Sequence, residues 1–150
     1  MKLKTLIGAG DHIMGFTLPF AIIGIIMNII YPQFFTMNMG FLRIILGFIF
    51  LLTGVPIWLI SVVQLIIYIP KNKLITTGPF AIVLHPIYSS VAILVIPGVS
   101  FLFDTWVGFG IGIILYIFSR IFSVKEDKKL NDIFSNEYQL YRSKVLLPWL

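Results

Sequence analysis

The chain has 150 residues, of which 59% are hydrophobic and only 11% are charged, and its net charge at pH 7 is +5. So much apolar surface cannot be buried inside 150 residues, so the composition excludes a soluble globule and indicates a single polytopic membrane domain over residues 1–150. The absence of cysteine excludes disulfides and thiolate chemistry, and two histidines far apart in the sequence show no metal-ligand spacing. Nucleic-acid binding is not expected, because the basic residues lie between and beside apolar runs, where they set membrane topology.

Four apolar runs predict an all-α membrane bundle with spans over about residues 13–31, 41–69, 86–103 and 105–124. We interpret the first run as a retained span, because it is long and no small-residue cleavage site is obvious. The second exceeds the roughly 20 residues that a bilayer needs, and Gly54-Val55-Pro56 predicts a kink in it. In the third run, Pro86 suits a first helical turn and Pro97-Gly98 predicts an internal break. The helical pattern of the fourth run continues to Phe134, which predicts a cytoplasmic C-terminal helix.

The basic residues predict the orientation of these spans. With four spans, both termini and the loop 70–79 share one side of the membrane. That side holds nine of the eleven basic residues, namely Lys2, Lys4, Lys71, Lys73, Lys125, Lys128, Lys129, Arg142 and Lys144. The positive-inside rule therefore predicts that this side faces the cytoplasm, in either the cell membrane or an endoplasmic-reticulum-type membrane.

The third and fourth runs are joined only by Asp104-Thr105, which predicts an antiparallel helical hairpin. Folding the chain about position 104.5 brings residue 85 opposite about 124, and residue 88 opposite about 121. One end of the hairpin therefore gathers five polar side chains: His85, Tyr88, Arg120, Glu126 and Asp127. A polar cluster at a membrane boundary is a candidate functional site.

Each of these residues also has a purely structural interpretation. His85 before a proline is able to anchor a helix start, and interfacial tyrosines such as Tyr88 usually form aromatic belts. Glu126-Asp127 beside three lysines is typical of a solvated charged face. The order and spacing of the motifs are more specific than any single residue.

Four motifs follow one another along the second half of the chain. They are Gly78-Pro79-Phe80, His85-Pro86-Ile87-Tyr88, Glu126-Asp127-Lys128-Lys129-Leu130, and Phe134 followed by Tyr138 and Tyr141. Together they resemble the isoprenylcysteine carboxyl methyltransferase and phospholipid methyltransferase superfamily, whose pattern is G-P-Y, R-H-P-x-Y, E-E-x-x-L and F-G-x-x-Y-x-x-Y. The resemblance covers about residues 72–148, and the first two spans resemble the family only in being apolar.

The resemblance implies an integral membrane methyltransferase that uses S-adenosylmethionine. It implies cofactor contacts from Asn72, Lys73, Leu74, Ile75, Phe80, Leu84, His85, Pro86, Tyr88 and Glu126. Chemically, a carboxylate suits the ribose hydroxyls or the ammonium group of the cofactor, a histidine or lysine suits its carboxylate, and apolar side chains suit its adenine. Tyr88 and Arg120 are the candidate catalytic residues.

The chain departs from the family pattern at several places, among them the ending Val145-Leu146-Leu147-Pro148, which lacks the family's arginine before the final proline. Leu84 stands where the family usually has arginine, so the charged contact is lost and only the backbone of Leu84 can contact the cofactor there. Asp127 replaces a second glutamate, and Ser135 replaces a glycine. Phe122 occupies the place of an arginine that orients the substrate carboxylate, and Arg120, two residues earlier, is the candidate replacement.

The expected acceptor is a lipophilic small molecule or prenylated protein that reaches the site from the lipid bilayer, with a prenylcysteine-like carboxylate as the methylated group. A carboxylate is ionised at pH 7 and needs no base, and the sequence shows no second carboxylate–histidine pair to deprotonate an amine. The alternatives are a phospholipid amine N-methyltransferase, a sterol-reductase-like NADPH enzyme, and a non-enzymatic structural or transport protein. No basic cluster for the 2′-phosphate of NADPH is evident.

Overall fold

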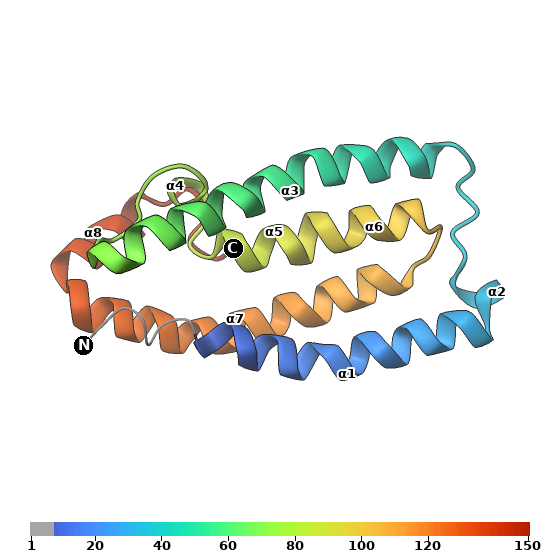
Figure 1. The fold of residues 1–150 in the computed structure, drawn as a ribbon, viewed down its shortest axis with the longest axis horizontal. Helices are drawn as coiled ribbons and strands as arrows, with labels where there is room; N and C mark the ends of the chain where they lie inside the picture. The colour runs from blue at the N-terminus through green and yellow to red at the C-terminus, as the bar shows by residue number, and fades with distance from the viewer. Residues whose placement is uncertain (1–7) are drawn as a thin grey trace.

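A computed structural model describes residues 8–150 of the chain, and this part is built of helices (Figure 1). In chain order the elements are α1 (Gly8–Ile30), α2 (Pro32–Phe35), α3 (Leu42–Tyr68), the 3-10 turn η2 (Ile69–Lys71), α4 (Pro79–Ile82), α5 (Pro86–Ser90), the π turn η3 (Val91–Val95), α6 (Ile96–Leu102), α7 (Val107–Phe134) and α8 (Asn136–Lys144). Two isolated bridges, Thr36 with Thr105 and Val83 with Leu147, are the only extended pairings within the described residues.

Three of these helices are long and apolar enough to cross a membrane, namely Gly10–Ile30, Leu42–Lys71 and Val107–Phe134. The continuous helix formed by α5, η3 and α6, Pro86–Leu102, is also apolar but shorter. Large apolar side chains are exposed along α1 and α3, and exposed apolar surface of this extent is compatible with lipid rather than with water. The fold is therefore a helical bundle compatible with an integral membrane protein.

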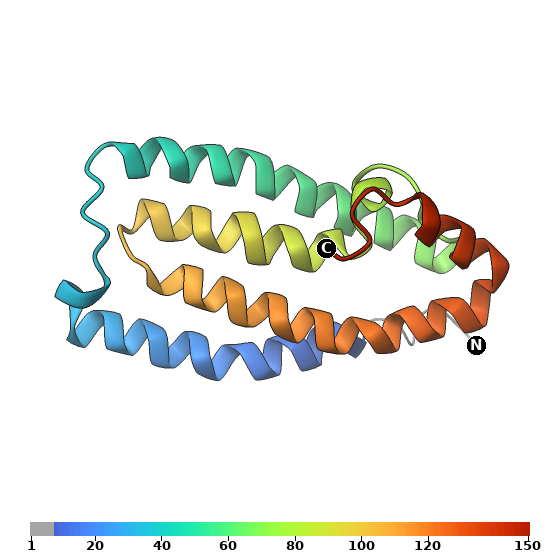
Figure 2. The same ribbon diagram turned by 180° about the vertical axis from the view of Figure 1, so that it is seen from behind.

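The long helices run side by side along the long axis of the molecule (Figures 1 and 2). α1 packs along α7, α3 packs along α5, η3 and α6, and α6 packs on α7. α8 lies at one end of the bundle with the loop that carries α4, whereas α2 and the α6–α7 turn lie at the other. Of the basic residues that set the predicted orientation, Lys2 and Lys4 lie outside the described residues.

The hairpin turns at Phe103 and Asp104, where the sequence predicts it, and Asp104 adopts a left-handed φ of 55°. Its polar contacts run farther along α7 than simple folding about position 104.5 predicts: His85 and Tyr88 meet residues 126 and 127 rather than 124 and 121. Helical side chains lean toward the N-terminus of their own helix. In α5 that direction points to the end of the hairpin, so long side chains reach later residues of α7.

Small residues let the two arms of the hairpin approach closely. A Cβ atom at Gly112 would collide with the carbonyl oxygen of Ala92, and one at Gly108 would collide with the Ser100 side chain, whereas one at Gly110 would meet open space. Close backbone contact of this kind is the usual way in which membrane helices associate, since lipid provides no hydrophobic driving force between them.

The break predicted at Pro97-Gly98 is a widening of the helix and not an interruption. Ile96 donates its N–H to the carbonyl of Val91, five residues earlier, which creates the π turn just before the proline. Pro97 has no N–H to continue the α-helical pattern, and a wider preceding turn accommodates its ring. α3 likewise runs unbroken through Pro56.

Polar contacts hold the end of the bundle that carries α2. Arg43 donates to the carbonyl of Leu102 at 2.6 Å and lies 3.8 Å from the Asp104 carboxylate. Thr105 donates to the Asn28 side chain at 2.8 Å, which ties α1 to the same turn. Polar side chains also gather at the opposite end of the bundle, where α5 begins, and there they line a cavity.

Candidate functional site

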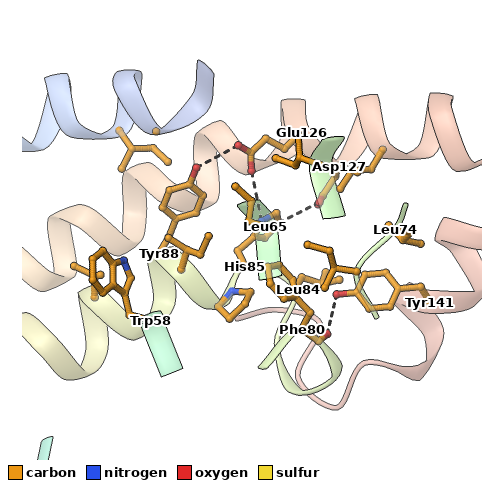
Figure 3. A pocket seen from close by; sticks show the side chains of 18 of the residues that line it. Trp58, Leu65, Leu74, Phe80, Leu84, His85, Tyr88, Glu126, Asp127 and Tyr141 are labelled. Atoms are coloured by element: carbon orange, nitrogen blue, oxygen red, sulfur yellow. Dashed lines mark hydrogen bonds and ion pairs between the residues drawn. The ribbon is translucent and has the colours of Figure 1, made fainter. Parts of the chain in front are cut away.

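A cavity of about 480 Å³ lies where the start of α5, the charged part of α7, the α4 loop and α8 meet (Figure 3). This volume is within the range typical of small-molecule sites. Nine residues that the resemblance implied as cofactor contacts line it: Lys73, Leu74, Ile75, Phe80, Leu84, His85, Pro86, Tyr88 and Glu126. The structure therefore brings together residues that are more than 50 positions apart in the sequence.

Two of the predicted site residues do not line this cavity, Asn72 and Arg120. Asn72 has a left-handed φ of 50° and donates its N–H to the carbonyl of Ile69, so it ends the 3-10 turn. The α7 residues that line the cavity include Leu115 and Glu126, eleven residues apart and thus about three turns on one face. Arg120 comes five residues after Leu115, which turns it well away from that face.

Five polar side chains are linked through the site, with His85 at the centre. Figure 3 shows four of them, Tyr88, Glu126, His85 and Asp127. The Nε2 atom of His85 lies 3.1 Å from Asp127 Oδ1, and its Nδ1 atom lies 3.7 Å from Glu126 Oε2. Tyr88 donates to Glu126 Oε1 at 3.3 Å, and Tyr138 donates to Asp127 Oδ1 at 2.7 Å. The network joins α5, α7 and α8.

The two carboxylates are not on a solvated charged face. The exposed fraction of the side chain is 14% for Glu126 and 16% for Asp127, and that of His85 is 10%. Buried carboxylates need hydrogen-bond partners or counter-charges. The structural interpretation of Glu126-Asp127 as surface charge is therefore wrong for both residues.

The segment that carries Phe80 and Leu84 is held by the C-terminal part of the chain. Tyr141 donates its hydroxyl to the carbonyl of Phe80 at 2.8 Å, and Leu147 donates its N–H to Ile82 at 2.8 Å. Leu84 is buried with Tyr138, Tyr141 and Val145 in one apolar cluster. Tyr138 and Tyr141, the tyrosines of the fourth motif, are thus both members of this cluster and hydrogen-bond donors that fix the site.

Local sequence explains the path of this segment. Gly78 has a φ of 64°, and a Cβ atom there would meet the side chain of Gln64 at 2.9 Å. Pro79 and Pro86 each occupy the first turn of a helix, α4 and α5, where a missing N–H costs nothing. The residue before a proline is held out of the helical region, so His85 precedes α5 with a φ of −123°.

The adjacent acids differ in their electrostatic state. Both follow Val124, the last residue of the apolar run of α7, and so lie beyond the apolar segment. Burial raises the pKa of Glu126 above its ordinary value, against opposing effects of His85 and the Tyr88 hydroxyl. Burial also acts to raise the pKa of Asp127, but hydrogen bonds from His85 and Tyr138 outweigh it and lower that pKa. Asp127 is thus a well-satisfied anion, whereas the charge of Glu126 is poorly compensated.

The two tyrosines of α8 remain protonated donors at physiological pH. Burial, reinforced by the hydrogen bond to Asp127, raises the pKa of Tyr138. Burial and the nearby Asp127 charge likewise raise the pKa of Tyr141. Within residues 8–150, no group of three or more His, Cys, Asp or Glu side chains is arranged to hold a metal ion.

Sequence reasoning missed the contribution of the first two long helices. Gly10, Asp11, Ile13 and Met14 of α1, and Trp58 and Leu65 of α3, also line the cavity. Asp11 is the one residue in this set that the sequence could have marked as a candidate, because it is an acid at the start of an apolar run. The others are part of continuous apolar runs, where no pattern separates a cavity-lining side chain from a lipid-facing one.

Comparison of the chain with family models, with curated proteins and with solved structures found no match. The functional assignment therefore rests on the motifs and on the geometry of the cavity.

Proposed function

We propose that this chain is an integral membrane methyltransferase that uses S-adenosylmethionine and acts on a lipophilic acceptor. One observation carries the proposal: a single cavity is lined by residues from all four motifs, including Phe80, His85, Glu126 and Tyr141. The long apolar hairpin separates the first two motifs from the last two, so independent structural roles give no reason for the two pairs to converge on one cavity of ligand size.

The proposal includes four spans with the site facing the cytoplasm. The helix Pro86–Leu102 has 17 residues and rises about 25 Å, slightly less than the roughly 30 Å hydrocarbon core. Its N-terminal end is covered by the α4 loop and α8, so backbone there need not meet lipid. The excess of lysine and arginine at the end of the bundle that carries α8 supports a cytoplasmic location for that end.

The residues of the cavity fit the parts of S-adenosylmethionine. When bound, this cofactor supplies a methyl carbon that its sulfonium already activates for displacement. Leu74, Phe80 and Leu84 offer an apolar surface for adenine. The under-compensated carboxylate of Glu126 suits the ribose hydroxyls or the ammonium group, and Lys73 suits the carboxylate. The contribution of the protein is to position the reacting groups and to exclude water.

For the acceptor, the first candidate is a prenylcysteine-like carboxylate, which needs no base because it is ionised at neutral pH. In this candidate Tyr88, beside Glu126, faces the reacting groups in the proposed catalytic role. Arg120, the other proposed catalytic residue, would have to reorient to reach a substrate carboxylate, because it does not line the cavity.

The charges of the cavity favour a second candidate, a lipid amine. Among the described residues, the Asp, Glu, Lys and Arg side chains that line the cavity are Asp11, Glu126, Asp127 and Lys73, so acidic residues predominate. An acidic site attracts an ammonium group and disfavours a second carboxylate.

Calorimetric titration of the purified protein in detergent with S-adenosylhomocysteine tests the cofactor site. Glu126→Gln removes a charge-assisted hydrogen bond worth about 1.5–3 kcal/mol, so we expect a loss of affinity of roughly 10- to 100-fold. Glu137→Gln is the matched control, because Glu137 is exposed on α8 and does not line the cavity. Absence of binding by the wild type, or equal effects of the two variants, would refute the proposed site.

A methyl-transfer assay separates the two acceptors. Prenylcysteine analogues and phospholipids with amine head groups are offered to the same preparation with radiolabelled cofactor. Methylation of the first alone supports carboxyl transfer, and methylation of the second alone supports amine transfer. Cofactor binding without methylation of either would contradict both acceptor classes.

A further inference from the structure

The cavity has its polar groups near its middle and an apolar end beside Trp58. Figure 3 shows Tyr88, Glu126 and His85 between Trp58 on one side and Leu74 and Tyr141 on the other. On α7 the lining extends from Glu126 back to Leu115, eleven residues earlier, which corresponds to about 16 Å along the helix. The cavity is therefore elongated, and its deeper part runs between apolar side chains.

Trp58 is in an unusual place for a membrane tryptophan. It precedes Tyr68, the last residue of α3, by ten residues, or about 15 Å of helix. That depth is near the middle of a bilayer core of roughly 30 Å, whereas tryptophans that anchor helices gather at the two interfaces. An aromatic belt therefore does not account for Trp58, but a wall at the end of a cavity does.

We propose that the apolar end of the cavity holds the hydrocarbon chain of the acceptor and that Trp58 sets the longest chain it accepts. Polar groups in the middle of the cavity, next to an apolar end at Trp58, complement an amphiphile with one hydrocarbon chain. The half of the chain that carries none of the four motifs also contributes to the cavity wall, through Met14 of α1 and Trp58 of α3. The inference rests on the proposed function for the identity of the acceptor, but its test requires only binding.

The length of the alkyl chain that a probe carries provides a measure of the depth of the cavity. Each methylene moved from water into an apolar site contributes about 0.8 kcal/mol, which corresponds to about fourfold in affinity. In a homologous series, affinity expressed against the aqueous concentration of free probe should rise about fourfold per methylene until the chain meets Trp58, and then level off or fall. The chain length at that break reports the depth of the cavity.

The test uses two series of straight-chain probes, S-alkyl-N-acetylcysteines and S-alkylcysteamines, titrated calorimetrically into the detergent-solubilised protein. Both series should show a break at the same chain length, because both carry the alkyl chain on a thioether sulfur and it is the end of that chain that meets Trp58. Trp58→Ala should move the break to longer chains. Phe48→Ala should leave it in place, because Phe48 is an exposed aromatic residue of the same helix, like Trp58, but does not line the cavity.

An unchanged break in Trp58→Ala, with thermal unfolding like that of the wild type, would overturn the inference. If Trp58→Ala does not fold, Trp58→Phe provides the same comparison with a smaller change in volume. In that case a break that stays at the wild-type chain length overturns the proposal, and one that moves to longer chains supports it.

Fluorescence gives a second, independent readout. The chain has three tryptophans, so replacement of Trp106 and Trp149 by phenylalanine leaves Trp58 alone. Probes with a terminal bromine should quench Trp58 saturably, and only above a minimum chain length. In a variant that retains only Trp106, the residue just before α7, quenching should rise linearly with probe concentration, because the probe only partitions into the micelle. A linear dependence at Trp58 as well would refute the chain site.

The results of these chain-length tests can be distinguished from the results of the cofactor-binding and methyl-transfer tests of the proposed function. A break that depends on Trp58, without cofactor binding or methyl transfer, would refute the methyltransferase proposal and retain the chain site. Methyl transfer at equal rates and affinities for all chain lengths would retain the enzyme and refute the chain site.

Discussion

The hydrogen bond between Tyr138 and Asp127 allows the contribution of the α7–α8 contact to stability to be calculated and measured. The two oxygens are 2.7 Å apart, and Tyr138 is only 2% exposed. A hydrogen bond to a charged group contributes about 1.5–3 kcal/mol. Tyr138→Phe removes the hydroxyl but keeps the ring that packs on Leu84 and Val145. We expect it to lower the midpoint of thermal unfolding by roughly 3–12 °C, at about 2–4 °C per kcal/mol.

The matched control is Tyr141→Phe, which removes a hydrogen bond of similar length to a neutral carbonyl, that of Phe80. A neutral bond contributes only about 0.5–1.5 kcal/mol, so the midpoint should fall less. Combining Tyr138→Phe with Asp127→Asn should cost little more than Asp127→Asn alone, because both changes weaken one interaction. An effect of Tyr138→Phe no larger than that of Tyr141→Phe, or full additivity in the double variant, would refute this reasoning.

Three further predictions follow from the same structure. Single cysteines that replace Thr36 and Asn136 should react with an impermeant thiol reagent from opposite sides of sealed vesicles. Reaction of both cysteines from the same side would contradict the four-span topology. Gly112→Ala places a methyl group against the facing helix and should destabilise the protein by about 1–3 kcal/mol in thermal unfolding, whereas Gly110→Ala, which meets open space, should not. Because burial raises the pKa of Glu126 in the folded protein, the folded state binds a proton more readily than the unfolded state, and this acid makes stability decrease as pH rises above its ordinary pKa. Glu126→Gln should therefore reduce the pH dependence of the unfolding midpoint and leave the protein no less stable at pH 8, whereas an unchanged pH profile would mean that another group is responsible.

Much of the fold follows from local sequence. Apolar runs of the length of a bilayer predict helices, and the single polar turn at Asp104 predicts the hairpin, because these features depend on residues close together in the chain. The spacing of the motifs also predicted that His85, Tyr88 and Glu126 would lie together. Their convergence requires only that the two arms of the hairpin have nearly equal length.

Only the tertiary structure decided which residues face the cavity. Adjacent helical residues differ by about 100° in direction, so Glu126 and Asp127 have the same chemistry in the sequence but different partners in the fold. The face of α7 is set by its packing against α1 and α6, and this packing turns Arg120 away from the cavity. For the same reason Trp58 gave no signal, because a uniformly apolar helix carries no local record of which side meets lipid and which side meets a cavity.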